Sequence, residues 1–153
     1  MPKNIYLDYA ATTPVDERVV AAMEPYWTKE FGNPSSLYKL GQRAKHDIDN
    51  SRQTVADFFN CQPEEILFTA GGTASINLAL KGLLGSYKEP MHIIISAIEH
   101  HAVLHTAEKL KKLGHEISVL PIDKDGLVNI KDLEAAIQDN TVLVSIMTAN
   151  NEI

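Results

Sequence analysis

Apolar residues recur at two different spacings along this chain. Up to about residue 60 the spacing is helical, which predicts one helix over 16–30 and a longer one with apolar positions between 44 and 58. Pro25 is expected to bend or end the first helix early, because proline lacks the backbone N–H that a helix interior uses. A Gly-Asn-Pro-Ser-Ser loop at 32–36 separates the two helices.

From residue 65 onward, short apolar runs alternate with helical segments. This alternation is typical of an α/β fold with a mostly parallel sheet and flanking helices. The expected strands are 66–69, 92–96, 116–120 and 142–147. The expected helices between them are 74–84, 101–113 and 130–138. Gly114 stands where a helix C-cap glycine belongs, and Asp125-Gly126 predicts a turn.

Length and composition agree with a folded domain. The chain has 153 residues, about the size of one ordinary domain. It is 44% hydrophobic and 22% charged without any biased stretch, which excludes the disordered and fibrous classes.

Charge and cysteine content limit which binding partners and which kinds of site are expected. The balance is acidic, with 20 Asp plus Glu against 14 Lys plus Arg, so neither nucleic acid nor a membrane is expected as a partner. No apolar run is long enough to cross a bilayer or to form a signal peptide, which favours the cytoplasm. The single Cys61 excludes an internal disulfide, and no metal-ligand spacing links the histidines, so no metal site is expected.

Four short strings, in this order, resemble the cysteine desulfurases of the class V aminotransferase group. They are Tyr6-Leu-Asp-Tyr-Ala-Ala-Thr-Thr-Pro14, Phe31-Gly-Asn-Pro-Ser-Ser36, Glu99-His100 followed by Ala102-Val-Leu104, and Val144-Ser-Ile-Met147 leading into Asn150-Asn-Glu-Ile153. A fifth string, Phe68-Thr-Ala-Gly-Gly-Thr73, fits the phosphate loop of the same family. The resemblance extends over the whole chain.

The resemblance implies an incomplete three-layer fold. The chain would be the amino-terminal part of the major domain of a fold type I transferase that depends on pyridoxal phosphate, and it lacks the carboxy-terminal strands. Residues 1–40 would form a leading segment with loops at the pocket mouth, and residues 41–153 a helix plus a partial α/β sheet. Strand 66–69 would then have no partner, and strand 142–147 would expose an apolar edge.

The implied activity is conversion of L-cysteine to L-alanine, with the sulfur transferred to an enzyme cysteine as a persulfide. The family keeps its cofactor-binding lysine and its nucleophilic cysteine in the half that follows this chain, so the chain is expected to be inactive alone. Cys61 follows the long helix with Glu64 and Glu65 close by, and we interpret it as structural.

Gly72 and Thr73 are the expected phosphate ligands. A strand followed by Gly-Gly-Thr and a helix offers a dianion backbone N–H groups, a favourable helix dipole and a hydroxyl. The alternative is a tight turn with an N-cap threonine. The family usually has glutamate at the next position, where this chain has Ala74.

His100 follows strand 92–96 at the carboxyl end, where ligands of open α/β sheets collect. The resemblance implies that it stacks on the cofactor ring and carries a proton, while the alternative is a surface or capping residue. Asn151 follows the last strand and, by the resemblance, contacts the cofactor's phenolic oxygen and the substrate carboxylate; the alternative is a turn residue.

Three interpretations of the chain remain open from sequence. It is one subunit of a split enzyme with a carboxy-terminal complementing chain, a truncated and inactive family member, or a scaffold module that kept the surface without the reaction. As an enzyme it would form a homodimer and deliver sulfur to an acceptor protein. Selenocysteine lyases and other class V members share much of this half and are alternative activities.

Overall fold

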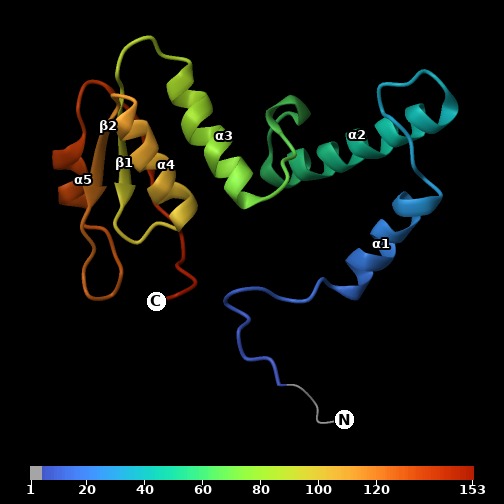
Figure 1. Ribbon diagram of the computed structural model, residues 1–153, viewed down its shortest axis with the longest axis horizontal. Helices are drawn as coiled ribbons and strands as arrows, with labels where there is room; N and C mark the ends of the chain where they lie inside the picture. Colours follow the sequence, from blue (N-terminus) through green and yellow to red (C-terminus); the bar gives the residue numbers. More distant parts are fainter. Residues whose placement is uncertain (1–4) are drawn as a thin grey trace. The chain divides into compact units, whose positions relative to one another are not determined.

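The computed structural model describes residues 5–153. By their internal contacts these residues form two compact units, which meet between Phe68 and Thr69 in the sequence and are called unit 1 and unit 2 below. Unit 1 contains α1 (Glu17–Thr28), α2 (Lys39–Phe59) and the short 3-10 helix η1 (Pro63–Glu65). Unit 2 contains three further helices and the sheet, drawn from green to red in Figure 1. In chain order its elements are α3 (Gly72–Gly85), β1 (His92–Ser96), α4 (His101–Lys112), β2 (Glu116–Leu120), α5 (Ile130–Ala136) and β3 (Thr141–Ser145).

The first helix continues through Pro25 to Thr28, so of the two effects expected of this proline, a bend or an early end, the early end does not occur at Pro25. Pro25 lies in the last turn of α1, and its carbonyl accepts hydrogen bonds from the backbone N–H groups of Lys29 and Glu30. Asp16 caps the other end by accepting from the backbone N–H of Arg18 at 2.8 Å. Pro25 has no N–H to donate to the Ala21 carbonyl four residues earlier, but its own carbonyl still closes the last turn of the helix.

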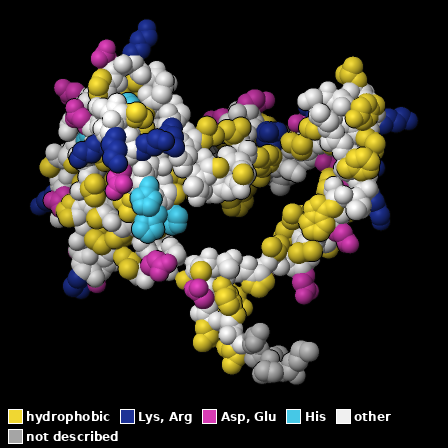
Figure 2. Space-filling view, viewed as in Figure 1, with side chains coloured by type: hydrophobic (Ala, Val, Ile, Leu, Met, Phe, Trp, Pro, Cys, Tyr) yellow, Lys and Arg dark blue, Asp and Glu magenta, His cyan; other side chains and the backbone are white. Residues whose placement is uncertain are grey.

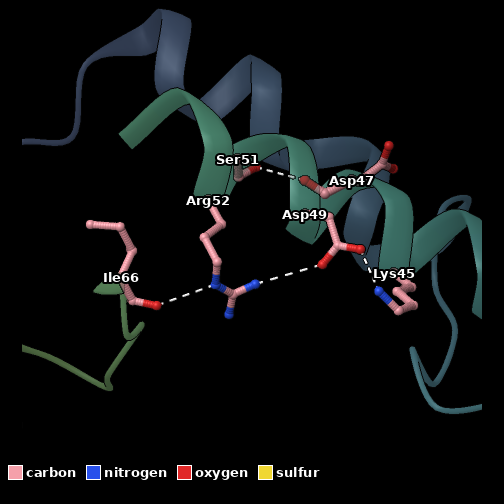
Figure 3. A network of polar contacts seen from close by, with 6 residues as sticks. All are labelled: Lys45, Asp47, Asp49, Ser51, Arg52 and Ile66. Atoms are coloured by element: carbon pink, nitrogen blue, oxygen red, sulfur yellow. Dashed lines mark hydrogen bonds and ion pairs between the residues drawn. The ribbon is translucent and has the colours of Figure 1, made fainter. Parts of the chain in front are cut away.

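Segment 66–69, predicted as a strand, forms no strand among the described residues. A strand needs partners for its backbone groups, and the sheet of unit 2 pairs only β1, β2 and β3. The Arg52 side chain instead reaches from α2 to this segment. Figure 3 shows its Nε donating to the Ile66 carbonyl at 3.2 Å, with an Asp49 carboxylate 3.7 Å from the guanidinium. The guanidinium also lies over the Phe68 ring, 5.1 Å from its centroid.

The three strands of unit 2 form a parallel sheet in the order β2-β1-β3. The central strand, β1, is buried along its whole length, as expected for a parallel strand with neighbours on both sides. Helices α3 and α4 pack on it, and the core side chains are Leu80, Leu84, Ile93, Ile95, Val103, Ala107 and Leu110.

Two predicted glycine positions are confirmed. Gly114 follows Leu113, the C-cap residue of α4, with a φ of +102°, and the next N–H, from His115, bonds back to the Leu110 carbonyl. Gly126, at φ +80°, closes the turn by donating its N–H to the Asp123 carbonyl at 3.1 Å.

His92 joins all three strands at the amino end of the sheet. Its side chain is buried, with Nδ1 2.7 Å from the Thr141 hydroxyl of β3 and Nε2 2.8 Å from the Ser118 hydroxyl of β2. Ligands of open α/β sheets bind at the opposite, carboxyl end. We therefore assign His92 to stability rather than to chemistry.

Replacing His92 with alanine should lower the free energy of unfolding by about 2–4 kcal/mol, because it creates a cavity and removes a hydrogen-bond partner from the half-buried hydroxyls of Ser118 and Thr141. The urea-unfolding midpoint measures the loss. His105→Ala on the exposed side of α4 is the control, and it should change the stability by no more than about 0.5 kcal/mol. Equal midpoints for the two variants would contradict this role of His92.

Candidate functional site

The carboxyl ends of β1 and β3 place two loops at one edge of the sheet. Because the two strands are parallel neighbours, loop 97–100 after β1 and loop 146–151 after β3 emerge on the same side. His100 lies in the first loop and Asn151 ends the second. The sheet thus brings together two of the residues selected from sequence.

His100 is the N-cap residue of α4, and its Nδ1 accepts a hydrogen bond from the Ala102 backbone N–H at 3.0 Å. A backbone N–H can only donate, so Nδ1 carries no proton and the proton of the neutral ring is on Nε2. The capping interpretation of His100 is therefore correct in this structure. It leaves the ring exposed with Nε2–H free to act as a donor.

The helix α3 begins two residues earlier in the phosphate-loop string than an N-cap threonine would require. Gly71 is the N-cap, with a φ of +153°, and Gly72 and Thr73 are the first two residues of the helix. No side chain caps this helix start. The alternative of an N-cap threonine is thus wrong, and the first N–H groups of α3 and the Thr73 hydroxyl are grouped at one helix end.

His100 lines two adjacent cavities of unit 2. The first, of about 440 Å³, includes Thr73, Asn77 and Lys81 of α3 and the exposed side of α4. The second, of about 460 Å³, includes Glu99 and Asn151. Thr73 and Asn151 are thus placed on either side of His100, whereas Gly72 lines neither cavity.

More histidines than the sequence analysis selected lie at this site. The His101 ring centroid is 6.2 Å from that of His100, and the His101 and His105 rings stack at 5.2 Å. Figure 2 shows histidine side chains gathered on this face of unit 2 beside basic side chains. Both His101 and His105 are exposed.

Sequence reasoning did not select Glu99 and Asn150, whose side chains connect the two loops. Glu99 is buried, and its Oε1 accepts from the Ser96 hydroxyl at 2.8 Å and from the Met147 backbone N–H at 2.7 Å. The Asn150 amide donates to the Ile98 carbonyl at 2.9 Å. The available signal was an ionisable residue three positions after the end of an apolar strand, next to a candidate histidine.

A larger cavity, of about 990 Å³, lies in unit 1 between α1 and α2 and is mostly apolar. Its polar residues mainly pair with each other: the Tyr26 hydroxyl donates to Asp47, which raises the pKa of that tyrosine. The hydrogen bonds from the Arg18 side chain and backbone lower the pKa of Asp16 at its rim. We place the site in unit 2 because strand ends and a helix start meet there.

Residues 5–153 contain neither a metal-binding cluster nor a membrane-spanning helix. No group of three or more His, Cys, Asp or Glu side chains is arranged to hold a metal ion. No helix in this range combines the length and apolar character needed to cross a membrane.

Comparison with known proteins places the whole chain in one family. The aminotransferase class-V family model matches residues 5–153. The cysteine desulfurase IscS of Methanosarcina thermophila is 51% identical over 152 residues, which cover 99% of this chain and 38% of that protein. The enzyme of the same name from Clostridium botulinum (strain Kyoto / Type A2) is 46% identical and is covered to 39%.

Solved structures agree with the sequence comparison. A NifS-like protein, 39% identical, superposes with a TM-score of 0.92 over 97% of this chain and 41% of its own. The apo cysteine desulfurase of Thermococcus onnurineus NA1, 34% identical, gives 0.83 over 96% of this chain and 37% of its own.

The chain therefore spans about two-fifths of the length of these relatives. The predicted fold class, an incomplete α/β fold type I large domain without its carboxy-terminal strands, is confirmed. The chain belongs to the aminotransferase class-V family.

Proposed function

We propose that this chain forms the amino-terminal part of a cysteine desulfurase that depends on pyridoxal phosphate. The proposed reaction transfers the sulfur of L-cysteine to an enzyme thiol, giving L-alanine and a persulfide. The observation that carries the proposal is the position of His100 between two cavities that contain Thr73 and Asn151. The curated relatives named above, which share about half of their matched residues with this chain, bear the same activity in their names.

The start of α3 fits a phosphate group. The first backbone N–H groups of the helix have no side-chain cap, and a Cβ added at Gly71 or Gly72 would meet no atom within 4 Å. An anion can therefore approach the backbone closely and accept from Gly72, Thr73 and the Thr73 hydroxyl. The dipole of α3, a helix of 14 residues, favours the negative charge.

His100 and Asn151 would act at the ring and the substrate. In this proposal the exposed imidazole stacks on the cofactor ring and holds its mobile proton on Nε2, because Nδ1 is occupied by the helix cap. The Asn151 amide orients the phenolic oxygen and the substrate carboxylate. When bound, pyridoxal phosphate supplies an electron sink for the charge that develops on the amino acid.

The rest of the family fold would supply the cofactor-binding lysine, the nucleophilic cysteine and the missing strands. This part is either the continuation of the polypeptide or a separate complementing chain. We further propose that the assembled enzyme is a homodimer that passes sulfur to an acceptor protein. Residues 1–40 would form the pocket mouth, and residues 41–153 the partial domain.

Thr73→Val should weaken binding of pyridoxal phosphate by the assembled enzyme about ten- to a hundredfold, since it removes a hydrogen bond to a charged group worth about 1.5–3 kcal/mol. Cofactor titration followed by absorbance measures the dissociation constant. Thr73→Ser keeps the hydroxyl and is the matched control, which should bind as the parent does. Unchanged affinity in Thr73→Val would exclude this hydroxyl as a phosphate ligand.

A further inference from the structure

Glu99 is a buried carboxylate without a cationic partner among the ion pairs of residues 5–153. Glu99 is 6% exposed. Removing a carboxylate from water costs free energy unless hydrogen bonds or opposite charges replace the lost hydration. A buried carboxylate of this kind needs a structural or functional reason. The proposed roles in cofactor and substrate binding belong to other residues and do not involve Glu99.

The compensation comes from the two strands that flank the site. Oε1 of Glu99 accepts from the hydroxyl of Ser96, the last residue of β1, at 2.8 Å. The same oxygen accepts from the backbone N–H of Met147, two residues beyond the end of β3, at 2.7 Å. One atom thus joins the ends of two neighbouring parallel strands.

A second hydrogen bond joins the same two loops. The Asn150 side chain donates to the Ile98 carbonyl at 2.9 Å, while its own Oδ1 accepts from the Glu152 backbone N–H. We call this pair of connections, Glu99 to Met147 and Asn150 to Ile98, the loop latch. His100 directly follows Glu99, and Asn151 directly follows Asn150.

We propose that Glu99 is a positioning residue that, through the loop latch, fixes the separation of His100 and Asn151 at the mouth of their shared cavity. This inference rests on the proposed function, because it assigns those two side chains to one ligand. A carboxylate suits the task, because one oxygen can accept two hydrogen bonds and draw the loops together. Asn150 supports the same geometry from the second loop.

The test compares Glu99→Ala with Glu99→Gln in the assembled enzyme. The alanine variant loses both bonds, so the Met147 amide should exchange its hydrogen faster, and kcat should fall about a hundredfold, as expected for a displacement of catalytic groups by about 1 Å. The glutamine carbonyl can accept both bonds, so Glu99→Gln should restore Met147 protection and most of kcat. Glu108→Ala, at an exposed glutamate of α4, is the matched control.

Amide exchange separates this inference from the proposed function, because it needs no turnover. Unchanged Met147 protection in Glu99→Ala would overturn the latch. Faster exchange with unchanged kcat would overturn the positioning role. If Glu99→Ala fails to fold, Asn150→Asp, which replaces the donor to Ile98 by an acceptor, should lower kcat with the cofactor still bound; unchanged kcat there would also overturn the proposal. If the Met147 amide exchanges faster in Glu99→Ala but the His100→Ala variant stays active, the proposed function is contradicted. The latch itself would still be supported.

Discussion

His100→Ala should lower kcat of the assembled enzyme about 10²–10⁴-fold, the range expected when a positioned proton carrier is removed. The geometry gives the reason: the ring is exposed at the carboxyl edge of the sheet, and its Nδ1 is engaged with the Ala102 N–H, which leaves Nε2 as the nitrogen available to a ligand. Steady-state release of sulfide from L-cysteine measures the change. Affinity for the cofactor should fall less than kcat, because the phosphate contacts remain.

His100→Asn is the matched control, because asparagine is a strong N-cap residue and its side-chain oxygen can accept from the same N–H. The substitution should keep the stability of α4, whereas His100→Ala should lose about 1 kcal/mol. Both variants should be equally inactive. Recovery of activity in His100→Asn would show that the histidine acts only as a helix cap.

The elements of unit 2 could be predicted because their patterns are local. The strands 92–96 and 116–120 coincide with β1 and β2, since each is a short apolar run between turn residues. The prediction for 66–69 failed because a strand forms only where another strand pairs with its backbone. Leu67 and Phe68 give that segment the right composition, but no neighbouring chain pairs with its backbone.

The candidate site was only partly predictable for a related reason. His100, Thr73 and Asn151 could be selected because each follows a strand or begins a helix, and the structure places all three along adjacent cavities. The bond from Glu99 to Met147 spans 48 positions, so no local pattern indicates it. Likewise, the tautomer of His100 depends on which backbone N–H its ring meets, which only the helix start determines.

The edges of the sheet bear on what the chain can do by itself. The order β2-β1-β3 leaves β3 at an edge, where Val144 is 40% exposed and Ile146, just beyond the strand, 41%. An apolar edge with free backbone groups is a site for pairing with further strands or for aggregation. In the solved relatives, the segment that matches this chain makes up only about two-fifths of the relative's own length. The rest of the relative's chain is therefore available to cover such an edge.

A polypeptide of these 153 residues should release no sulfide from L-cysteine, and activity should appear when it is joined to or co-expressed with a carboxy-terminal complement. A suitable complement is the remainder of the Methanosarcina thermophila relative, whose matched part is 51% identical to this chain. The reaction needs a lysine to bind the cofactor and a thiolate to receive the sulfur, and the family keeps both outside this region.

Cys61 is the thiol that could contradict this prediction. It lies in unit 1 just after α2, where its backbone N–H closes the helix end on the Ala56 carbonyl, and it is half-buried. This setting at the end of a helix in unit 1 is a structural one, whereas the family keeps its nucleophilic cysteine outside this region. The assembled enzyme with Cys61→Ser should therefore keep its turnover. Sulfide release by the chain alone would refute the need for a complement, and loss of turnover in the assembled Cys61→Ser enzyme would identify Cys61 as the sulfur acceptor.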